Sequence, residues 1–383
     1  MQLRKFFSIV AAIMILGANV HASESVKTNE PIKIGVYLPL TGPFAFGGEL
    51  EGAGIEVAHR KIPEVLGRKV ELIVVDNKSD KVEAANAIMR LTANDKVSAI
   101  IGSYGSSLSL AGGEVAEKAK TPVVASSATN PLITLGKKYY FRASFTDTYQ
   151  GESAATYAIR TLHAKKAAIL KDISSDYGVG LANYFSKSFK QLGGEIVANL
   201  NYNSGDQDFS AALMQIIAQK PDILFITSYF SEGAIILKQA RELGVKFRIM
   251  GADAMDNPET VTIAGDSAEG FLHTTLAYDE DMPNMSKAAQ EFTEAWKELY
   301  PNQKTNMNSV AGYVSYTMIM KAIENAGSAN REDITRELAK LKDFQTPFGK
   351  ISIDKNHNPI MPVGVIEIKG GKRVYLGEVE SDG

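Results

Sequence analysis

The 383-residue chain contains no cysteine. This absence excludes disulfide bonds, metal sites built on thiolates, a cysteine nucleophile and a lipid-modified N-terminal cysteine. Long apolar runs are also scarce, because no stretch after residue 22 is apolar over the length that crosses a bilayer. The formal net charge is only −3 and no basic block occurs, so we expect neither nucleic acid nor an anionic membrane surface as a partner.

Catalytic signatures are missing as well. The histidines are scattered, none lies four residues from another, and the chain has no zinc-protease, P-loop or nucleophile-elbow motif. We therefore predict no catalytic residue, no metal site and no cofactor, which favours a binding protein over an enzyme. A hydrolase or transferase whose residues meet only in space is the weaker alternative.

The N-terminus has the pattern of an export signal. Arg4 and Lys5 precede an apolar run from Phe6 to Leu16, and the small-residue sequence "VHA" follows. We predict a signal peptide over residues 1–22 and a periplasmic mature protein. An uncleaved anchor is the alternative, although the run is shorter than the roughly 20 residues that a spanning helix needs.

Short apolar runs alternate with longer amphipathic ones along the rest of the chain. We expect strands at 32–40, 69–77, 97–103, 121–127, 167–172, 195–202, 222–229, 247–253 and 270–278. The spacing of apolar residues between them predicts helices at 49–62, 82–91, 179–192, 209–219 and 232–243. Two more helices, at 285–300 and 308–327, precede a hairpin-like stretch at 349–378. Strand–helix alternation of this kind implies βαβ units with parallel sheets.

About nine strands are too many for one small sheet, so we expect two sheets in two lobes. The predicted fold is α/β, with two Rossmann-like lobes whose parallel-sheet cores are joined by a hinge of three chain crossings. The first lobe is predicted at 31–143 plus 278–348, and the second at 144–277 plus 349–383. The crossings are expected near 141–147, near 274–280 and around Gly349.

Polar loops follow several of the predicted strands, and ligands of open α/β sheets bind beyond the carboxyl ends of the strands. Ser106 and Ser107 lie just before a predicted helix start, and Ser127 and Thr129 end the next strand. Free N–H groups, a helix dipole and hydroxyls without a fixed charge suit a carboxylate. The alternative is that these serines and Thr129 are only helix caps and turn formers.

After strands of the second half of the chain, the sequence has an acidic residue and two tyrosines in place of uncharged hydrogen-bond donors. Asp253 follows a strand and could hold an ammonium group, whereas Tyr177 and Tyr229 could cover an apolar side chain. Ordinary packing of the two tyrosines, and a capping role for Asp253, are equally open from the sequence.

Four segments in this order resemble the branched-chain amino-acid-binding family of periplasmic solute receptors, which serve ATP-driven uptake. They are "TGPFAFGGE", "SSATNPLIT", "DYGVGLA" and "AGDSAEGF". The resemblance spans essentially the whole mature chain. It implies a type I periplasmic binding protein that closes over a small amino acid or related ligand and delivers it to a membrane ABC permease as a monomer. A ligand-sensing receptor of the same fold, for amides or aromatic acids, is the alternative.

The resemblance also assigns roles to particular residues. It implies that Ser106, Ser127 (through its backbone) and Thr129 bind a carboxylate, that Asp253 binds an ammonium, and that Tyr177 and Tyr229 contact the ligand. The chain departs from the leucine-type pattern at three positions. Asp253 stands where those members have glutamate, Gly47 where they have an aromatic residue, and Gly105 where they have a cysteine.

Overall fold

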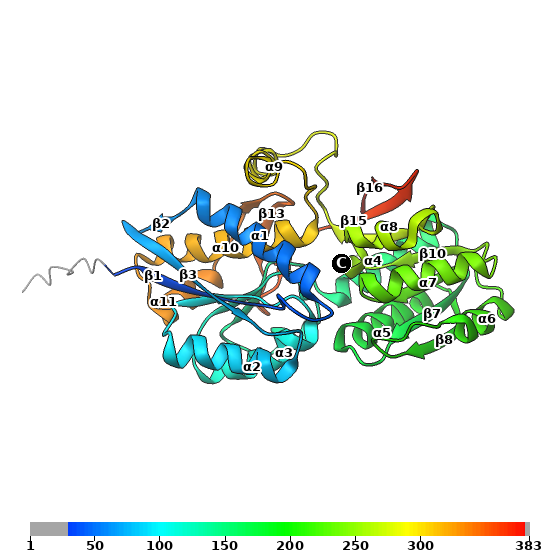
Figure 1. The fold of residues 1–383 in the computed structure, drawn as a ribbon, viewed down its shortest axis with the longest axis horizontal. Helices are drawn as coiled ribbons and strands as arrows, with labels where there is room; N and C mark the ends of the chain where they lie inside the picture. The colour runs from blue at the N-terminus through cyan, green and yellow to red at the C-terminus, as the bar shows by residue number, and fades with distance from the viewer. Residues whose placement is uncertain (1–29, 380–383) are drawn as a thin grey trace, which may run out of the picture. The chain divides into compact units, whose positions relative to one another are not determined.

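The computed structural model describes residues 30–379, so the predicted signal peptide lies outside the described residues. The first sheet is parallel except for its edge strand β2 (Figure 1). Its spatial order is β2 (Glu64–Val65), β3 (Arg68–Asp76), β1 (Ile32–Leu38), β4 (Ala99–Ile101), β5 (Val123–Ala125) and β6 (Tyr140–Arg142).

The second sheet joins five parallel strands to an antiparallel pair from the end of the chain. Its order is β16 (Lys372–Val379), β15 (Val363–Lys369), β11 (Leu272–Leu276), β10 (Arg248–Gly251), β9 (Ile223–Thr227), β7 (Lys166–Asp172) and β8 (Glu195–Tyr202). A small antiparallel sheet is made of β12 (Phe344–Thr346), β13 (Gly349–Ile353) and β14 (Pro359–Ile360).

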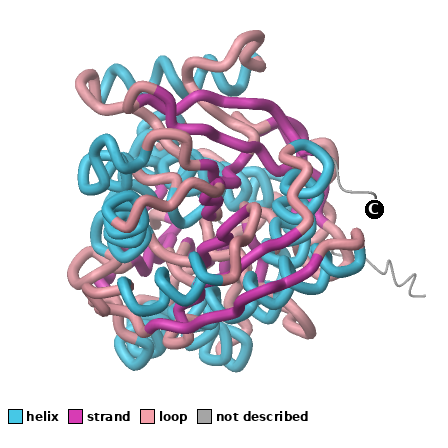
Figure 2. Tube along the Cα trace, turned by 90° about the vertical axis from the view of Figure 1, so that its right-hand side faces the viewer, coloured by secondary structure: helices cyan, strands magenta, loops and turns pink. Residues whose placement is uncertain are grey.

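Helices cover the strands of both large sheets (Figures 1 and 2). Those of the first lobe are α1 (Ala45–Lys61), α2 (Lys81–Met89), α3 (Ser106–Lys118), α9 (Lys287–Leu299), α10 (Met307–Ala326) and α11 (Arg331–Leu338). Those of the second lobe are α4 (Asp147–Thr156), α5 (Asp176–Gln191), α6 (Ser210–Ala218), α7 (Phe230–Glu242) and α8 (Pro258–Ala264). None of the helices within residues 30–379 has the length and apolar character to span a membrane.

The predicted α/β fold with two parallel-sheet lobes is confirmed, and each expected strand and helix has its counterpart. The hairpin-like stretch at 349–378 is a correction, because it forms two hairpins in different sheets. Ile351 and Met361 are buried in the core of the first lobe, and the chain enters the second sheet only at Val363. The third crossing therefore falls at 361–362 rather than around Gly349, whereas the other predicted lobe boundaries stay predictions.

Two glycines let α1 and α10 approach so closely that their backbones touch. A Cβ atom at Gly54 would lie 1.8 Å from the carbonyl oxygen of Ser309, and one at Gly312 would lie 2.1 Å from that of Glu51. Any larger residue would force the helices apart, since the neighbouring atoms belong to backbone. This contact brings the first turns of α10 beside Glu51, in the region where the polar loops of the first lobe end.

Candidate functional site

All six residues predicted to bind a ligand line one cavity of about 240 Å³, where the two lobes meet. The cavity is lined by Tyr104, Gly105, Ser106, Ser127, Thr129, Tyr177, Tyr229, Asp253, Ala254 and Asn308. Only about 10 Å³ of this space is free for a water-sized molecule, so the side chains of the two lobes nearly fill it.

The first lobe presents hydrogen-bond donors to this cavity. Ser106 is the first residue of α3, preceded by Gly105 with φ of 88°, so the free N–H groups of the helix start lie at the cavity. The Ser127 hydroxyl donates to the buried carboxyl group of Glu51. Its side chain is thereby engaged, which leaves the Ser127 backbone for any ligand. Thr129 lies at the end of the neighbouring loop, and its carbonyl accepts a hydrogen bond from the backbone N–H of Asp147 (2.9 Å).

The second lobe presents a carboxyl group. Asp253 Oδ1 accepts hydrogen bonds from Gln150 Nε2 (2.8 Å) and from the Tyr177 hydroxyl (2.7 Å), which fix the orientation of the side chain. Burial raises the pKa of Asp253 to about 7, although the hydrogen bond from Tyr177 acts in the opposite direction. The capping alternative for Asp253 is not what the structure has, because its side chain makes no cap hydrogen bond and Asn257 caps α8.

Aromatic rings from both lobes meet at one side of the cavity. The Tyr229 ring centroid lies 5.4 Å from that of Tyr177, 5.8 Å from that of Tyr104 and 4.5 Å from that of Phe44. Phe44 and Tyr104 belong to the first lobe, so this cluster spans the gap between the lobes. Gly47 makes room for it, because a Cβ atom there would lie 2.6 Å from the Tyr104 ring.

Sequence reasoning missed two buried carboxyl groups beside the cavity. Glu51 is fully buried, and its Oε2 has no hydrogen-bond partner among the described residues. Asp147, the first residue of α4, is fully buried too, and neither of its carboxyl oxygens accepts a hydrogen bond within residues 30–379. Burial and the nearby charge of Asp253 hold the pKa of Asp147 well above its usual range. One signal for Glu51 was available, since it shares a helical stripe with Ile55 and Ala58.

The missed Glu51 predicts a pH-dependent stability of the ligand-free protein. Burial raises its pKa to about 8, with the hydrogen bond from Ser127 acting in the opposite direction. The folded protein therefore retains this proton where the unfolded chain has lost it, so the contribution is present below pH 4.5 and is lost as the pH rises to about 8.

The pKa of Glu51 rises from 4.5 to about 8, and one pKa unit corresponds to about 1.4 kcal/mol. We therefore expect Glu51→Gln to be roughly 4 kcal/mol more stable than wild type at pH 8.5 and within about 1 kcal/mol of it at pH 5. Urea unfolding at both pH values measures the difference. Glu49→Gln, which alters an exposed residue of the same helix, is the control. A Glu51→Gln variant that is less stable at pH 8.5 would show that Glu51 is ionised and stabilising.

The lobes are also joined beside the cavity, at the start of α5. The Ser107 hydroxyl donates to Asp176 Oδ2 (2.7 Å), Asn130 Nδ2 donates to the Asp176 carbonyl oxygen (2.9 Å), and Lys81 Nζ lies 3.2 Å from Asp176 Oδ2. Ser107 is thus neither a simple cap nor part of the cavity lining. It holds the first lobe against the second at a point where the ends of α3 and α5 meet.

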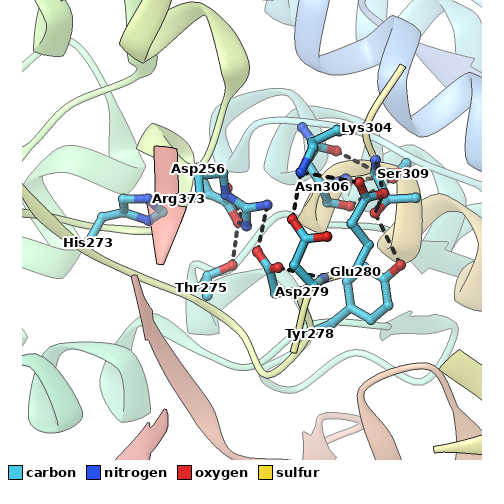
Figure 3. A network of polar contacts seen from close by, with 12 residues as sticks. Asp256, His273, Thr275, Tyr278, Asp279, Glu280, Lys304, Asn306, Ser309 and Arg373 are labelled. Carbon is cyan, nitrogen blue, oxygen red and sulfur yellow. Dashed lines mark hydrogen bonds and ion pairs between the residues drawn. The ribbon is translucent and has the colours of Figure 1, made fainter. Parts of the chain in front are cut away.

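A network of ion pairs surrounds the segment that follows β11, which we call the hinge segment (residues 277–281; Figure 3). Arg373 of β16 lies between two buried carboxylates, with Nη2 3.0 Å from Asp256 Oδ1 and Nη1 3.0 Å from Asp279 Oδ2. The Thr275 hydroxyl also donates to Asp256. Ion pairs of this one arginine therefore join the second lobe to the hinge segment.

The first lobe binds the C-terminal end of the same segment through ion pairs and hydrogen bonds. Lys304 Nζ lies 2.6 Å from Asp281 Oδ2 and 3.5 Å from Glu280 Oε1. Glu280 Oε2 also accepts hydrogen bonds from the backbone N–H and hydroxyl of Thr305 (3.1 and 2.9 Å). A wide groove adjoins this network between α1 and α8. Arg373, Lys304 and the carboxylates of the hinge segment, which line this groove, already pair with one another. The groove therefore presents no matched set of free donors and acceptors like that of the cavity at Asp253.

Comparison with known proteins identifies close relatives over nearly the whole described chain. The family described as periplasmic binding protein matches residues 31–372. A leucine-, isoleucine-, valine-, threonine- and alanine-binding protein of Pseudomonas aeruginosa is 30% identical over 353 residues, which cover 91% of each chain. The crystal structure of a leucine-binding protein from Thermotoga maritima has a TM-score of 0.88 and 40% identity, covering 92% of this chain and 99% of that one.

A branched-chain amino acid transporter substrate-binding protein from Streptococcus pneumoniae, solved with isoleucine, is also similar. Its TM-score is 0.86 and its identity 31%, with coverage of 91% of this chain and 99% of that one. These likenesses extend over both lobes and over the segments that join them.

Proposed function

Because the chain belongs to the periplasmic binding protein family, we propose that it captures a small amino acid between its two lobes for an ABC importer. One observation carries the proposal: the cavity lined by the six predicted residues has complementary walls. Its first-lobe wall holds the N–H groups at the start of α3 and the hydroxyl of Thr129, and its second-lobe wall holds Asp253. The first wall suits a carboxylate and the second an ammonium group, which are the two ends of an α-amino acid.

Neither lobe alone can satisfy both ends of a zwitterion, so full affinity requires the lobes to meet over the ligand. Charge-assisted hydrogen bonds contribute roughly 1.5–3 kcal/mol each. Four or five of them, offset by desolvation and by lost freedom of motion, give about −8 kcal/mol, a micromolar dissociation constant. Closure around the ligand is a hinge motion of the kind that two-lobed binding proteins perform.

The rest of the proposal concerns location and partners. The signal-like N-terminus supports export to the periplasm, and we propose that the monomeric protein delivers its ligand to a membrane permease without altering it chemically. The alternative partner is a membrane sensor that detects the closed form. A permease and an ATPase encoded beside this gene would support the importer, whereas a sensor gene there would support signalling.

A ligand screen tests the function. We expect at least one amino acid at 1 mM to raise the melting temperature by several degrees, because a micromolar ligand at about 1,000 times its dissociation constant adds about 4 kcal/mol. The panel comprises the standard amino acids, their amides and aromatic acids, and mass spectrometry checks that the bound compound is unchanged. No shift with any amino acid, confirmed by calorimetry, would refute the proposal, and turnover of the compound would support an enzyme.

A further inference from the structure

The cavity has almost no aliphatic lining. Apart from the methyl group of Ala254, its wall consists of hydroxyl-bearing, aromatic, carboxyl and amide side chains together with Gly105. Leucine, isoleucine, valine and methionine side chains do not occur among the lining residues. The hydroxyls of Ser127 and Tyr177 are already engaged within the protein. With Ser106, Thr129 and Asp253 assigned to the amino-acid backbone of the ligand, the polar groups that remain for its side chain are the amide of Asn308 and the hydroxyls of Tyr104 and Tyr229.

Asn308 is the second residue of α10 and is only 2% exposed. The residue lines the cavity. The helix start does not need this side chain, because Asn306 and Ser309 already form a complete capping box. The amide of Asn308 therefore remains available to a polar group of a ligand in the cavity.

Tyr104 is a second buried residue of the cavity wall whose polar group is available to a ligand. Its side chain is 3% exposed, and its hydroxyl has no hydrogen-bond partner among residues 30–379. The ring is held in place by Gly47, which leaves it room, and by edge contacts with Phe44 and Tyr229. The hydroxyl is therefore fixed beside the cavity as a second unused donor and acceptor.

We propose that Asn308 and Tyr104 bind the side chain of the ligand by hydrogen bonds, and that the ligand is a small amino acid with a hydroxyl or amide side chain. The inference rests on the proposed function and narrows it. An aliphatic side chain of the same shape would bury both groups without partners, and a site built for hydrogen bonds discriminates strongly against such an analogue.

Pairs of amino acids with matching shapes provide the test. Threonine and valine differ by a hydroxyl in place of a methyl group, and asparagine and leucine differ similarly by an amide in place of an isopropyl group. We expect calorimetry to show that the polar member of at least one pair binds wild type at least tenfold more tightly than its apolar partner. We expect Asn308→Leu to abolish or reverse that preference, because it replaces the amide with an apolar group of similar size.

Asn302→Leu is the matched control, since it makes the same change in an exposed loop six residues away and should leave the preference intact. Tyr104→Phe is a second variant, which should keep the melting temperature of the ligand-free protein while reducing the preference. If Asn308→Leu does not fold, the binding preference of Tyr104→Phe decides the test. Tighter binding of the apolar member in both pairs would overturn this inference but leave the proposed function standing. Failure of every amino acid to bind would overturn both.

Discussion

Asp253→Asn is expected to weaken ligand binding by about 3–5 kcal/mol, or two to four orders of magnitude in the dissociation constant, because a buried charge pair loses one partner. The substitution keeps the size of the side chain and leaves an oxygen to accept hydrogen bonds from Gln150 and Tyr177. We therefore expect the melting temperature of the ligand-free variant to equal or exceed that of wild type above pH 7. Calorimetry with the best ligand of the screen measures the loss.

The pH dependence of binding provides an independent test of the same residue. The pKa of Asp253, which burial raises to about 7, must fall when an ammonium group arrives, so below that pH binding has to expel a proton. Wild-type affinity should decrease by up to tenfold per pH unit below 7, and Asp253→Asn should lack this dependence.

Asp266→Asn, at an exposed position of the same lobe, is the control for the Asp253 experiments. Near-normal affinity of Asp253→Asn would contradict the assignment and transfer it to Asp147, whose buried carboxyl oxygens accept no hydrogen bond from the described residues. Two other acids of the second lobe are already engaged. Asp256 pairs with Arg373, and Glu232 accepts a hydrogen bond from the backbone N–H of Gly205 (2.9 Å).

Arg373→Met should have the largest effect on folding stability. The arginine is the cation for Asp256 and Asp279, whose side chains are 0% and 5% exposed, and methionine would leave both carboxylates buried without it. Removing one partner of a buried ion pair costs about 3–5 kcal/mol. Urea unfolding of the ligand-free protein at pH 7.5 measures the loss.

Arg248→Met is the matched control for that loss. Arg248 belongs to the same lobe and also pairs with an acid, Glu367, at 3.0 Å, but its side chain is 53% exposed. An exposed pair contributes about 0–1 kcal/mol, so this variant should remain close to wild type. If Arg373→Met were as stable as Arg248→Met, the hinge segment would not depend on the arginine, and its carboxylates would be protonated or hydrated.

Much of the fold could be predicted because its strands are short apolar runs and its helices have clear amphipathic spacing. The run at 222–229, for example, became β9, all of whose residues are buried. The C-terminal region was harder, since both of its hairpins have the same local pattern. Only the burial of Ile351 in one core and of Val365 in the other distinguishes them, and that difference is set by tertiary packing.

The six predicted site residues could be located because each follows a strand, and strand ends of a parallel sheet converge. Glu51 could not, since it lies inside a helix, where a single polar residue normally faces solvent. Asp147 and Asn308 lie at helix starts, where the sequence alone does not distinguish a buried polar residue from an exposed one. Their burial depends on contacts distant in sequence, such as the close approach of α1 and α10 at Gly54. The ion pairs of Arg373 could not be predicted either, because its partners lie about a hundred residues away along the chain.

The interleaved course of the chain has a consequence for its synthesis. The core of the first lobe needs α10, and the second sheet needs β15 and β16, the last strands of the described chain. An N-terminal domain commonly folds while the ribosome is still making the rest of a protein. In this chain neither lobe can complete its core early, because each core includes residues that are synthesised near the end. We therefore expect the growing polypeptide to remain unfolded until it is almost complete, and an unfolded polypeptide is the form that can pass through a narrow translocation pore.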